Sequence, residues 1–225
     1  MNNVKEAIVT PVQRKLLTLG FVPYGTGRRE PFDVIFGAEK QVTPADILAG
    51  SVDALVIWGG EDIHPSLYNE EVNGAHVGHD LSTRDVIENG VCLAAIKAGV
   101  PIIGICRGAQ LVCALAGGKL YQHVTGHMGT HPITTKDGLE YNTSSIHHQM
   151  MDVRAMPKED YDLIAWSKNN LSKGTHADDS TIEPEIVYFP KIKGLAIQGH
   201  PEFMHPDCDF VTYTQKLVAD YLLEK

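Results

Sequence analysis

The sequence lacks the long apolar stretch that a membrane-spanning helix requires. No run among its 225 residues approaches 18 uninterrupted apolar positions, and the first ten residues carry neither the basic nor the apolar segment of a secretion signal. We therefore expect no membrane partner and no secretion. Basic residues are also few, 19 against 28 acidic ones, which gives a formal net charge of -9. This balance disfavours a nucleic-acid partner, because binding to phosphates usually needs a basic face.

Cysteine is sparse as well. The four cysteines follow neither a disulfide framework nor a Cys-x-x-Cys metal motif, which is typical of a reducing compartment and predicts a cytoplasmic protein. The chain contains no Gly-x-x-x-x-Gly-Lys phosphate loop, and we expect no cofactor. Histidine, in contrast, is plentiful at 11 residues, so we expect some histidines to take part in chemistry.

The chain has the composition of a packed protein, with 43% hydrophobic and 21% charged residues. No repeat, low-complexity tract or Pro/Ser-rich linker divides it, so residues 1–225 are expected to form a single domain. Short Val- and Ile-rich runs alternate with helical patterns, which is typical of parallel strands buried on both faces. The expected strands cover residues 7–9, 21–24, 53–58, 100–105, 182–189 and 194–198, the last two adjacent in the sheet.

The expected helices have recognisable ends. Thr43 and Pro44 favour a helix start, residues 82–98 predict a helix that ends at Gly99, and a closing amphipathic helix begins at about Asp207. The alternation of strands and helices predicts an α/β fold with an open, mostly parallel sheet and helices on both faces. Ligands of such sheets bind beyond the carboxyl ends of the strands.

One strand runs directly into a helix at a cysteine. Residues 104–110 read GICRGAQ, a glycine two positions before and two positions after Cys106, which is the pattern of a sharp turn that lifts a nucleophile above the sheet. Such a turn exposes the thiol at a helix N-terminus, which favours the thiolate. The N–H groups of Arg107 and of the loop at Gly60 are the candidate donors of an oxyanion hole.

A nucleophilic cysteine needs a base, and the base needs an acceptor that orients it. His200 and Glu202 follow the expected last strand and are separated by one proline, so both can point to the same site. The candidate catalytic residues are therefore Cys106, His200 and Glu202.

Several motifs resemble a known family. GICRGAQ together with HPE at residues 200–202 is similar to the class I, triad-type glutamine amidotransferase superfamily, which has a flavodoxin-like fold. Within it, four further segments resemble the γ-glutamyl-GABA hydrolase group of the peptidase C26 family. These segments are GGEDIHP at 59–65 with Tyr68, the stretch from Asp80 through Arg84 and Asp85 to Glu88, GGKLYQ at 117–122, and SIHHQ at 145–149.

The resemblance implies cysteine-dependent hydrolysis of a γ-glutamyl amide, either glutamine or a γ-glutamyl-amine, through a γ-glutamyl thioester. It places Gln110 and the backbone around Ser145 and Ile146 at the substrate's α-amino and α-carboxylate groups. For His147, which belongs to the same motif, a role beside the substrate and a structural role both stay open. In place of the bulky aromatic residue that usually precedes the HPE motif stands Gly199, which we expect to open the pocket beside the base, and residues 25–50 match no motif.

Neither of two histidine groups is expected to bind a metal. His123, His127 and His131 are spaced by four, but the glycines and the proline among them disfavour a helix that would align them. The group around His205 is equally weak. His64, His76 and His79 are expected at solvated or rim positions.

Three functions remain open at this point. The first is a stand-alone hydrolase with a small-molecule γ-glutamyl substrate, and the second is a glutaminase subunit that delivers ammonia to an ATP-dependent synthetase on another chain. The third, a non-catalytic binding relative, is disfavoured by the intact Cys106, His200 and Glu202. A homodimer is left open.

Overall fold

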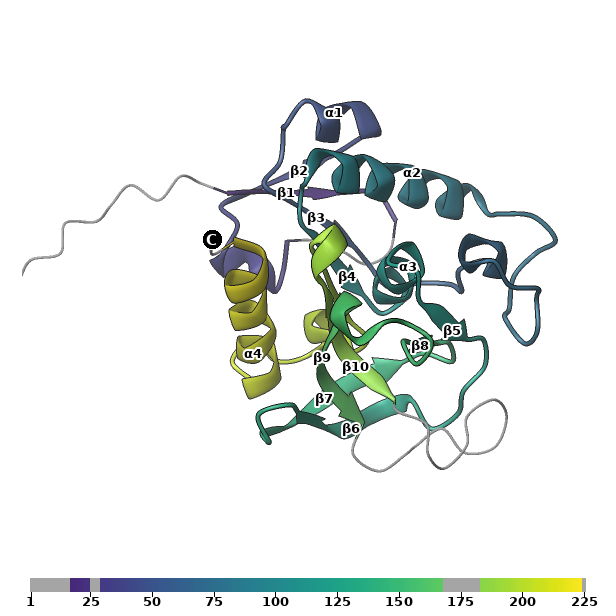
Figure 1. Ribbon diagram of the computed structural model, residues 1–225. Coiled ribbons are helices and arrows are strands. Elements are labelled where there is room, and N and C mark those ends of the chain that lie inside the picture. Colours follow the sequence, from purple (N-terminus) through teal and green to yellow (C-terminus); the bar gives the residue numbers. More distant parts are fainter. Residues whose placement is uncertain (1–16, 25–28, 168–182, 224–225) are drawn as a thin grey trace, which may run out of the picture.

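The computed structural model describes residues 17–24, 29–167 and 183–223. Its main sheet has nine strands (Figure 1). They are β1 (Thr18–Phe21), β2 (Ala38–Gln41), β3 (Ala54–Ile57), β4 (Ile102–Ile105), β6 (Met128–Thr135), β7 (Glu140–Ile146), β9 (Asp162–Ser167), β10 (Pro184–Phe189) and β11 (Gly194–Ile197). A separate two-stranded sheet pairs β5 (Lys119–Tyr121) with β8 (Met150–Asp152).

The main sheet has a parallel part and an antiparallel part. Its order is β2-β1-β3-β4-β11-β10-β9-β6-β7, and the pairings from β2 to β11 are parallel. The remaining pairings are antiparallel, including β10 with β11, which are adjacent as predicted. The predicted parallel sheet is confirmed for the part that carries β3, β4 and β11, and the antiparallel extension adds a wall beyond it.

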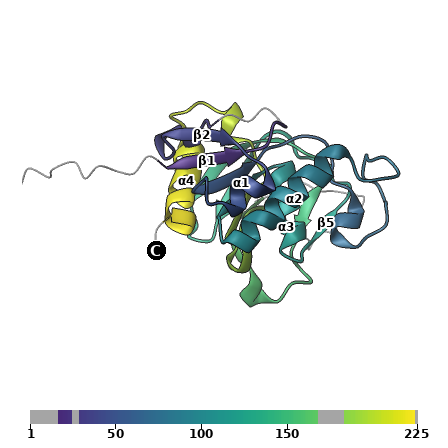
Figure 2. The same ribbon diagram turned by 90° about the horizontal axis from the view of Figure 1, so that it is seen from above.

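Helices cover both faces of this sheet (Figures 1 and 2). They are α1 (Pro44–Leu48), α2 (Thr83–Ala98), α3 (Arg107–Leu115) and α4 (Asp209–Val218), which continues as a π-helical turn over Ala219–Leu223. Leu55 and Ile57 of β3 pack in one hydrophobic cluster with residues of α2 and α3. Ala54 and Val56, the alternate residues of the same strand, pack in a second cluster with residues of α4. The strand is apolar on both sides because each side is covered.

The helix ends follow the predicted signals. The Ser82 hydroxyl accepts a hydrogen bond from the N–H of Asp85 at 3.0 Å, and the Asp85 carboxylate accepts one from the N–H of Ser82 at 3.1 Å. This reciprocal pair begins α2, and Gly99 ends it with a left-handed φ of 69°. Thr43 and Asp46 begin α1 in the same way.

Short 3-10 segments complete the described chain, at Phe32–Val34, Pro65–Tyr68, Lys158–Asp160, Pro190–Ile192 and Pro201–Phe203. The strand expected at residues 7–9 lies outside the described residues. The strand expected at 21–24 was placed too late, because β1 ends at Phe21 where its pairing with β3 ends. None of the helices within residues 17–24, 29–167 and 183–223 combines the length and apolar character that crossing a bilayer requires.

Candidate active site

Cys106 occupies a strained turn between β4 and α3. Its backbone has φ 50° and ψ -106°, a conformation that non-glycine residues rarely adopt and that costs about 1–3 kcal/mol. The two flanking glycines allow the turn, because a Cβ at Gly104 would clash with the backbone of Gly108, and a Cβ at Gly108 would clash with the carbonyl of Ile57. The predicted sharp turn at Cys106 is therefore present.

The thiol faces a cavity rather than open solvent. Cys106 as a whole is only 3% exposed, so the expectation of an exposed thiol was wrong. Sγ lies 4.0 Å from the carbonyl oxygen of Ile146, on the far wall of a cavity of about 230 Å³. The antiparallel extension supplies that wall, and β7 ends at Ile146. The thiol is buried because the antiparallel extension covers it. The sequence around Cys106 does not predict this extension.

His200 and Glu202 lie directly beside Cys106. Nδ1 of His200 is 2.7 Å from Oε1 of Glu202, and the interaction of the His200 ring with Cys106 contributes to the raised pKa of the ring. Both side chains are almost fully buried, with exposed fractions of 6% and 7%. The imidazole therefore connects the thiol on one side to the carboxylate on the other.

Gly59 makes room for this imidazole. A Cβ at Gly59 would lie 2.6 Å from Cε1 of His200 and 3.4 Å from Cβ of Cys106, too close for the ring. A residue without a side chain is therefore needed at position 59, where His200 approaches Cys106.

The pKa of His200 is raised from 6.5 to about 10. Burial alone lowers it, but the hydrogen bonds with Cys106 and Glu202 raise it by more. Because the folded-state pKa exceeds the ordinary value, this interaction stabilises the fold fully below pH 6.5 and is lost as the pH rises toward 10.

We expect a histidine NMR titration to find the His200 ring protonated up to about pH 10. Glu202→Gln removes a negative partner and should lower the His200 pKa by roughly 1–3 units. His205→Gln, which changes an exposed ring nearby, is the matched control and should leave the His200 titration unchanged. A His200 ring that titrates identically in wild type and Glu202→Gln would contradict this assignment.

The two candidate oxyanion donors, the N–H groups of Gly60 and Arg107, come from the loop after β3 and from the start of α3. Arg107 is the first residue of α3, where backbone N–H groups have no partner in a preceding turn. The guanidinium of Arg84 donates to the carbonyls of Trp58 and Gly59, at 2.9 and 3.0 Å. In a trans peptide the N–H of Gly60 points opposite to the Gly59 carbonyl, and hence away from Arg84. Gly60 lines the cavity.

A buried ionic network lies behind these donors. The Arg107 side chain is fully buried and bonds to Asp85 at 2.6 Å and to Glu88. Glu88 also accepts from Arg84 at 2.8 Å, and Arg84 reaches Glu61 at 2.9 Å. Burial raises the pKa of Glu88, while the two arginines act in the opposite direction. The network joins α2 to the sharp turn at Cys106, here called the elbow, and to the glycine loop formed by Gly59 and Gly60.

Of the residues expected to bind the substrate, three line the cavity and one, Ser145, lies behind its wall. Gln110, Ile146 and His147 line the cavity. The amide of Gln110 donates to the carbonyl of Gln149 at 2.8 Å. Ser145 does not line the cavity, because its hydroxyl is fully buried and donates to the carbonyl of His127.

His147 carries no charge at neutral pH. Burial lowers its pKa to about 3, and its Nδ1 lies 2.8 Å from the carbonyl of Gln149. On its buried side it neighbours His127 and Glu185, whose ligand atoms lie within 4.8 Å of one another. Glu185 already contacts His131 at 2.9 Å and Ser167 at 2.7 Å. His147 therefore offers the cavity a neutral imidazole, held by the hydrogen bond between its Nδ1 and the carbonyl of Gln149.

Gly199 does not open the pocket beside the base. A Cβ at this position would clash with the hydroxyl of Thr143, because β7 packs directly against the chain there. The N–H of His200 donates to the carbonyl of Ser144 at 2.9 Å. The expected opening was wrong, because the strand β7 occupies that space.

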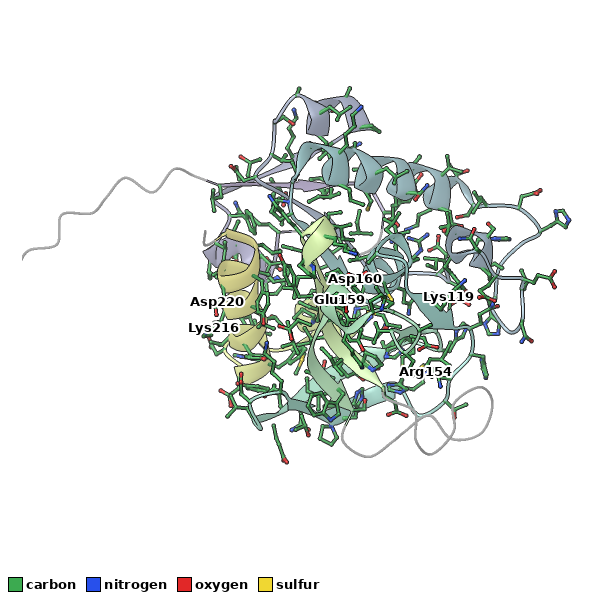
Figure 3. The ribbon with its side chains drawn as sticks, in the orientation of Figure 1. Lys119, Arg154, Glu159, Asp160, Lys216 and Asp220 are labelled. Carbon is green, nitrogen blue, oxygen red and sulfur yellow. The ribbon has the colours of Figure 1, made fainter. Side chains whose placement is uncertain are left out.

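A larger groove lies elsewhere on the protein. Its volume is about 750 Å³, and charged side chains line it, among them Glu70, Lys119, Asp152 and Arg154. Figure 3 labels Lys119 and Arg154. These side chains are engaged in ion pairs, Lys119 with Glu70 and Arg154 with Asp152. No cysteine or histidine lines this groove, so the smaller cavity at Cys106 is the candidate active site.

The remaining residues singled out in the sequence lie outside the cavity, and one of them differs from expectation. His64 is buried and caps the segment Pro65–Tyr68 through a hydrogen bond from the N–H of Ser66, so its expected solvated position was wrong. His79 is exposed as expected. Trp58 is a core residue and stacks on Phe32.

Comparison with known proteins identifies the family of this chain. The family model of peptidase C26 matches residues 28–202. A protein of Lactococcus lactis, YvdE, described by its name as glutamine amidotransferase-like, is 31% identical over 172 residues, which are 67% of this chain and just under two thirds (66%) of that protein.

Solved structures share the fold. A glutamine amidotransferase of Thermotoga maritima has a TM-score of 0.55 at 13% identity, covering 91% of this chain and 82% of that one. The glutaminase domain of a Trypanosoma brucei CTPS, solved with bound acivicin, has a TM-score of 0.56 at 14% identity and covers 90% and 92%. The chain belongs to the peptidase C26 family, within the class I glutamine amidotransferase superfamily.

Proposed function

We propose that this protein hydrolyses a γ-glutamyl amide, with Cys106 as nucleophile, His200 as base and acid, and Glu202 as the acceptor that orients His200. One observation carries the proposal: a cysteine in a strained turn lies against a histidine that is paired with a glutamate, at the wall of a small cavity. Membership of peptidase C26 supports an amide-hydrolysing chemistry.

The first half of the reaction forms a thioester. The pair reacts as the Cys106 thiolate beside the protonated His200 ring, whose pKa is raised to about 10, and the thiolate attacks the side-chain carbonyl carbon of the substrate. The negative oxygen accepts hydrogen bonds from the N–H groups of Gly60 and Arg107. The C–N bond then breaks, and the amine or ammonia leaves with the proton from His200.

The second half releases glutamate. Water gives a proton to His200, and its oxygen attacks the thioester carbonyl. The C–S bond breaks, Cys106 is again a thiolate and His200 keeps the proton taken from water, while the new carboxyl group of glutamate loses its proton to solvent. Glu202 keeps the imidazole in place during both halves and does not itself react.

The cavity is suited to a small substrate. Its volume of about 230 Å³ is below the usual 300–1,000 Å³ of ligand sites. Gln110 and neutral His147 offer uncharged polar groups to an amino-acid head that carries one charge of each sign. We propose Gln110, His147 and the backbone at Ile146 as the substrate-binding residues.

A second candidate is a glutaminase subunit that passes ammonia to an ATP-dependent synthetase on another chain. The glutaminase domain of the Trypanosoma brucei CTPS favours it, because that domain and this chain cover each other almost completely. All four cysteines are unpaired thiols, which supports a cytoplasmic location for either function.

The test is release of glutamate and ammonia from glutamine, γ-glutamyl-GABA and other γ-glutamyl amides. Isoglutamine, whose amide is on the α-carboxyl group, is the matched control and should not react. Release by the purified protein alone supports the hydrolase. Release that requires cell extract with ATP supports the glutaminase subunit, and no release in either condition overturns both.

A further inference from the structure

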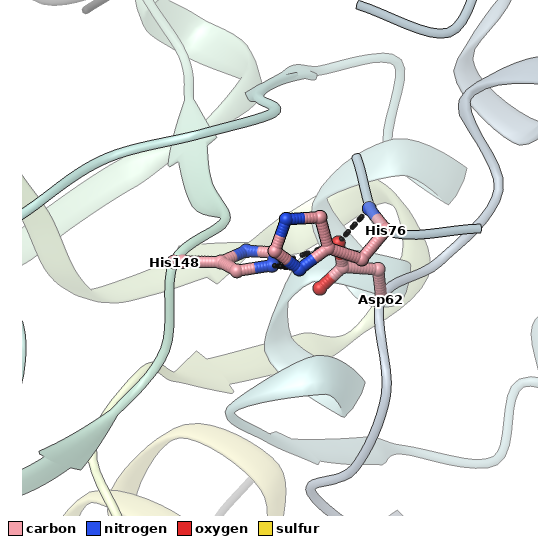
Figure 4. A group of neighbouring side chains, drawn as sticks. All are labelled: Asp62, His76 and His148. Carbon is pink, nitrogen blue, oxygen red and sulfur yellow. Dashed lines mark hydrogen bonds and ion pairs between the residues drawn. The ribbon is translucent and has the colours of Figure 1, made fainter. Parts of the chain in front are cut away.

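A second group of convergent side chains borders the cavity, outside the proposed catalytic residues. It consists of Asp62, His76 and His148 (Figure 4). Asp62 follows the glycine loop after β3, His76 comes from the loop before α2, and His148 lies between β7 and β8. The three residues are far apart in the sequence, and the fold brings them together.

Their potential ligand atoms point at one another. Nε2 of His148 lies 2.7 Å from Nδ1 of His76 and 3.2 Å from Oδ2 of Asp62. All three atoms fall within 4.8 Å of one another. In a tetrahedral Zn²⁺ site, bonds of about 2.0–2.1 Å keep ligand atoms roughly 3.3 Å apart. To reach this spacing, Nδ1 of His76, an exposed residue, has to move away from Nε2 of His148 by about 0.6 Å.

Contacts of the backbone hold the members of this group in place. The N–H of His76 donates to Oδ2 of Asp62 at 2.6 Å. The side-chain amide of Gln149 makes two hydrogen bonds with the backbone of Ile63. It accepts one from the N–H at 3.2 Å and donates one to the carbonyl at 3.4 Å. The segments that carry Asp62 and His148 are thus tied together next to the ligand atoms. Such support from the surroundings is what a metal site needs in order to be preorganised.

The chemistry of the three groups selects a class of ion. Two imidazoles and one carboxylate form a mixed nitrogen and oxygen set, which suits Zn²⁺ and similar divalent transition metals and does not suit Mg²⁺ or Ca²⁺. With neutral imidazoles the set carries one negative charge, which favours a dication. Asp62 and His148 also line the cavity of Cys106.

We propose that Asp62, His76 and His148 bind one divalent transition-metal ion of the Zn²⁺ class at the wall of the Cys106 cavity. Three protein ligands leave a fourth position, which faces water or an anionic group of a molecule in the cavity. The ring of His123 lies beside the group, with its centroid 5.6 Å from that of His148. The assignment does not depend on the hydrolytic function, because it concerns different side chains.

The buried group of His127, His147 and Glu185 is the other set with convergent ligand atoms among the described residues. It differs because Glu185 is fully buried and already contacts His131 and Ser167. A hydrogen-bond network accounts for its geometry. In the first group, exposed His76 and half-buried Asp62 and His148 give an ion a path from solvent.

The proposal is tested by titrating metal-free protein with Zn²⁺ in competition with a chromophoric chelator. Wild type should bind one ion per chain. His76→Ala should weaken binding by roughly 100-fold or more, since even the loss of a supporting group costs 10–100-fold. His79→Ala removes an exposed histidine from the same loop and should bind as wild type. Because His76 is exposed, its variant should keep the fold.

A further variant separates this site from the catalytic cysteine. Cys106→Ser should retain Zn²⁺ binding, and Co²⁺ bound to wild type should show no thiolate-to-cobalt charge-transfer band. Absence of stoichiometric binding, equal affinity in His76→Ala and wild type, or loss of binding in Cys106→Ser would each overturn the assignment. None of these results bears on γ-glutamyl hydrolysis, which the substrate panel tests separately.

Discussion

Cys106→Ala is expected to lower the rate of glutamate release by roughly 10³–10⁶-fold, the range found when the nucleophile of a triad is removed. The thiol is the only part lost, and alanine carries the same backbone cost as cysteine at a φ of 50°. The thermal unfolding temperature should therefore stay close to that of wild type. Initial rates and thermal unfolding, measured on the same preparation, check both parts.

Cys208→Ser is the matched control, because Cys208 is half-buried and lies away from the cavity. Its glutamate release should equal that of wild type. Residual turnover near the wild-type rate in Cys106→Ala would remove the proposed nucleophile.

Covalent labelling gives an independent readout of the same residue. A glutamine-analogue diazo-ketone should modify Cys106, and prior substrate should slow the modification. Cys92 and Cys113 should stay unlabelled, because burial raises the pKa of both thiols and both are inaccessible. A labelled peptide that carries Cys92 or Cys113 would contradict the assignment of the elbow.

The parallel part of the fold could be predicted because its signals are local. β3 and β4 are buried on both faces and read as apolar runs, and the ends of α2 are marked by Ser82 and Gly99. β2 could not be predicted in this way. Its residues are polar and mostly exposed, and it is a strand only because it pairs with β1 at the sheet edge.

The strands β6, β7 and β9 of the antiparallel extension were missed for a related reason. β7 alternates buried and exposed residues, among them Thr143 and Ser145, whose side chains are polar but buried. Their burial depends on partners from β6 and from the chain at Gly199, which are distant in sequence. This extension also decides that the Cys106 thiol faces a cavity.

The residues of the candidate site also differ in whether a local sequence signal marks them. Cys106, His200 and Glu202 lie in short motifs that mark them in the sequence, and the parallel pairing of β4 with β11 brings them together in the fold. The residues of the buried ionic network on α2 were noticed in the sequence only because their segment resembles the family, and no role was predicted for them. Arg84 and Glu88 are one helical turn apart, but only the fold shows that they are buried and that Arg107 joins them. His76 had no local signal, since its neighbours in space are 14 and 72 residues away in the chain.

Arg107→Ala is expected to destabilise the protein by about 3–5 kcal/mol, the usual cost of breaking a buried ion pair. The guanidinium is fully buried, and its loss leaves Asp85 without that partner and Glu88 with Arg84 alone. The backbone N–H at this position remains, so the effect reports on the side chain. Urea unfolding of both proteins measures the difference.

The pH dependence of this difference has a definite sign. Without Arg107 the pKa of the buried Glu88 carboxyl group rises further, so the folded variant takes up more protons than the unfolded chain as the pH falls. The gap in unfolding free energy should therefore narrow between pH 7 and about 5. Arg154→Ala, which breaks an exposed pair with Asp152, is the control and should cost less than about 1 kcal/mol. If the unfolding free energy of Arg107→Ala is within about 1 kcal/mol of that of wild type at pH 7, the buried network does not stabilise the turn at Cys106.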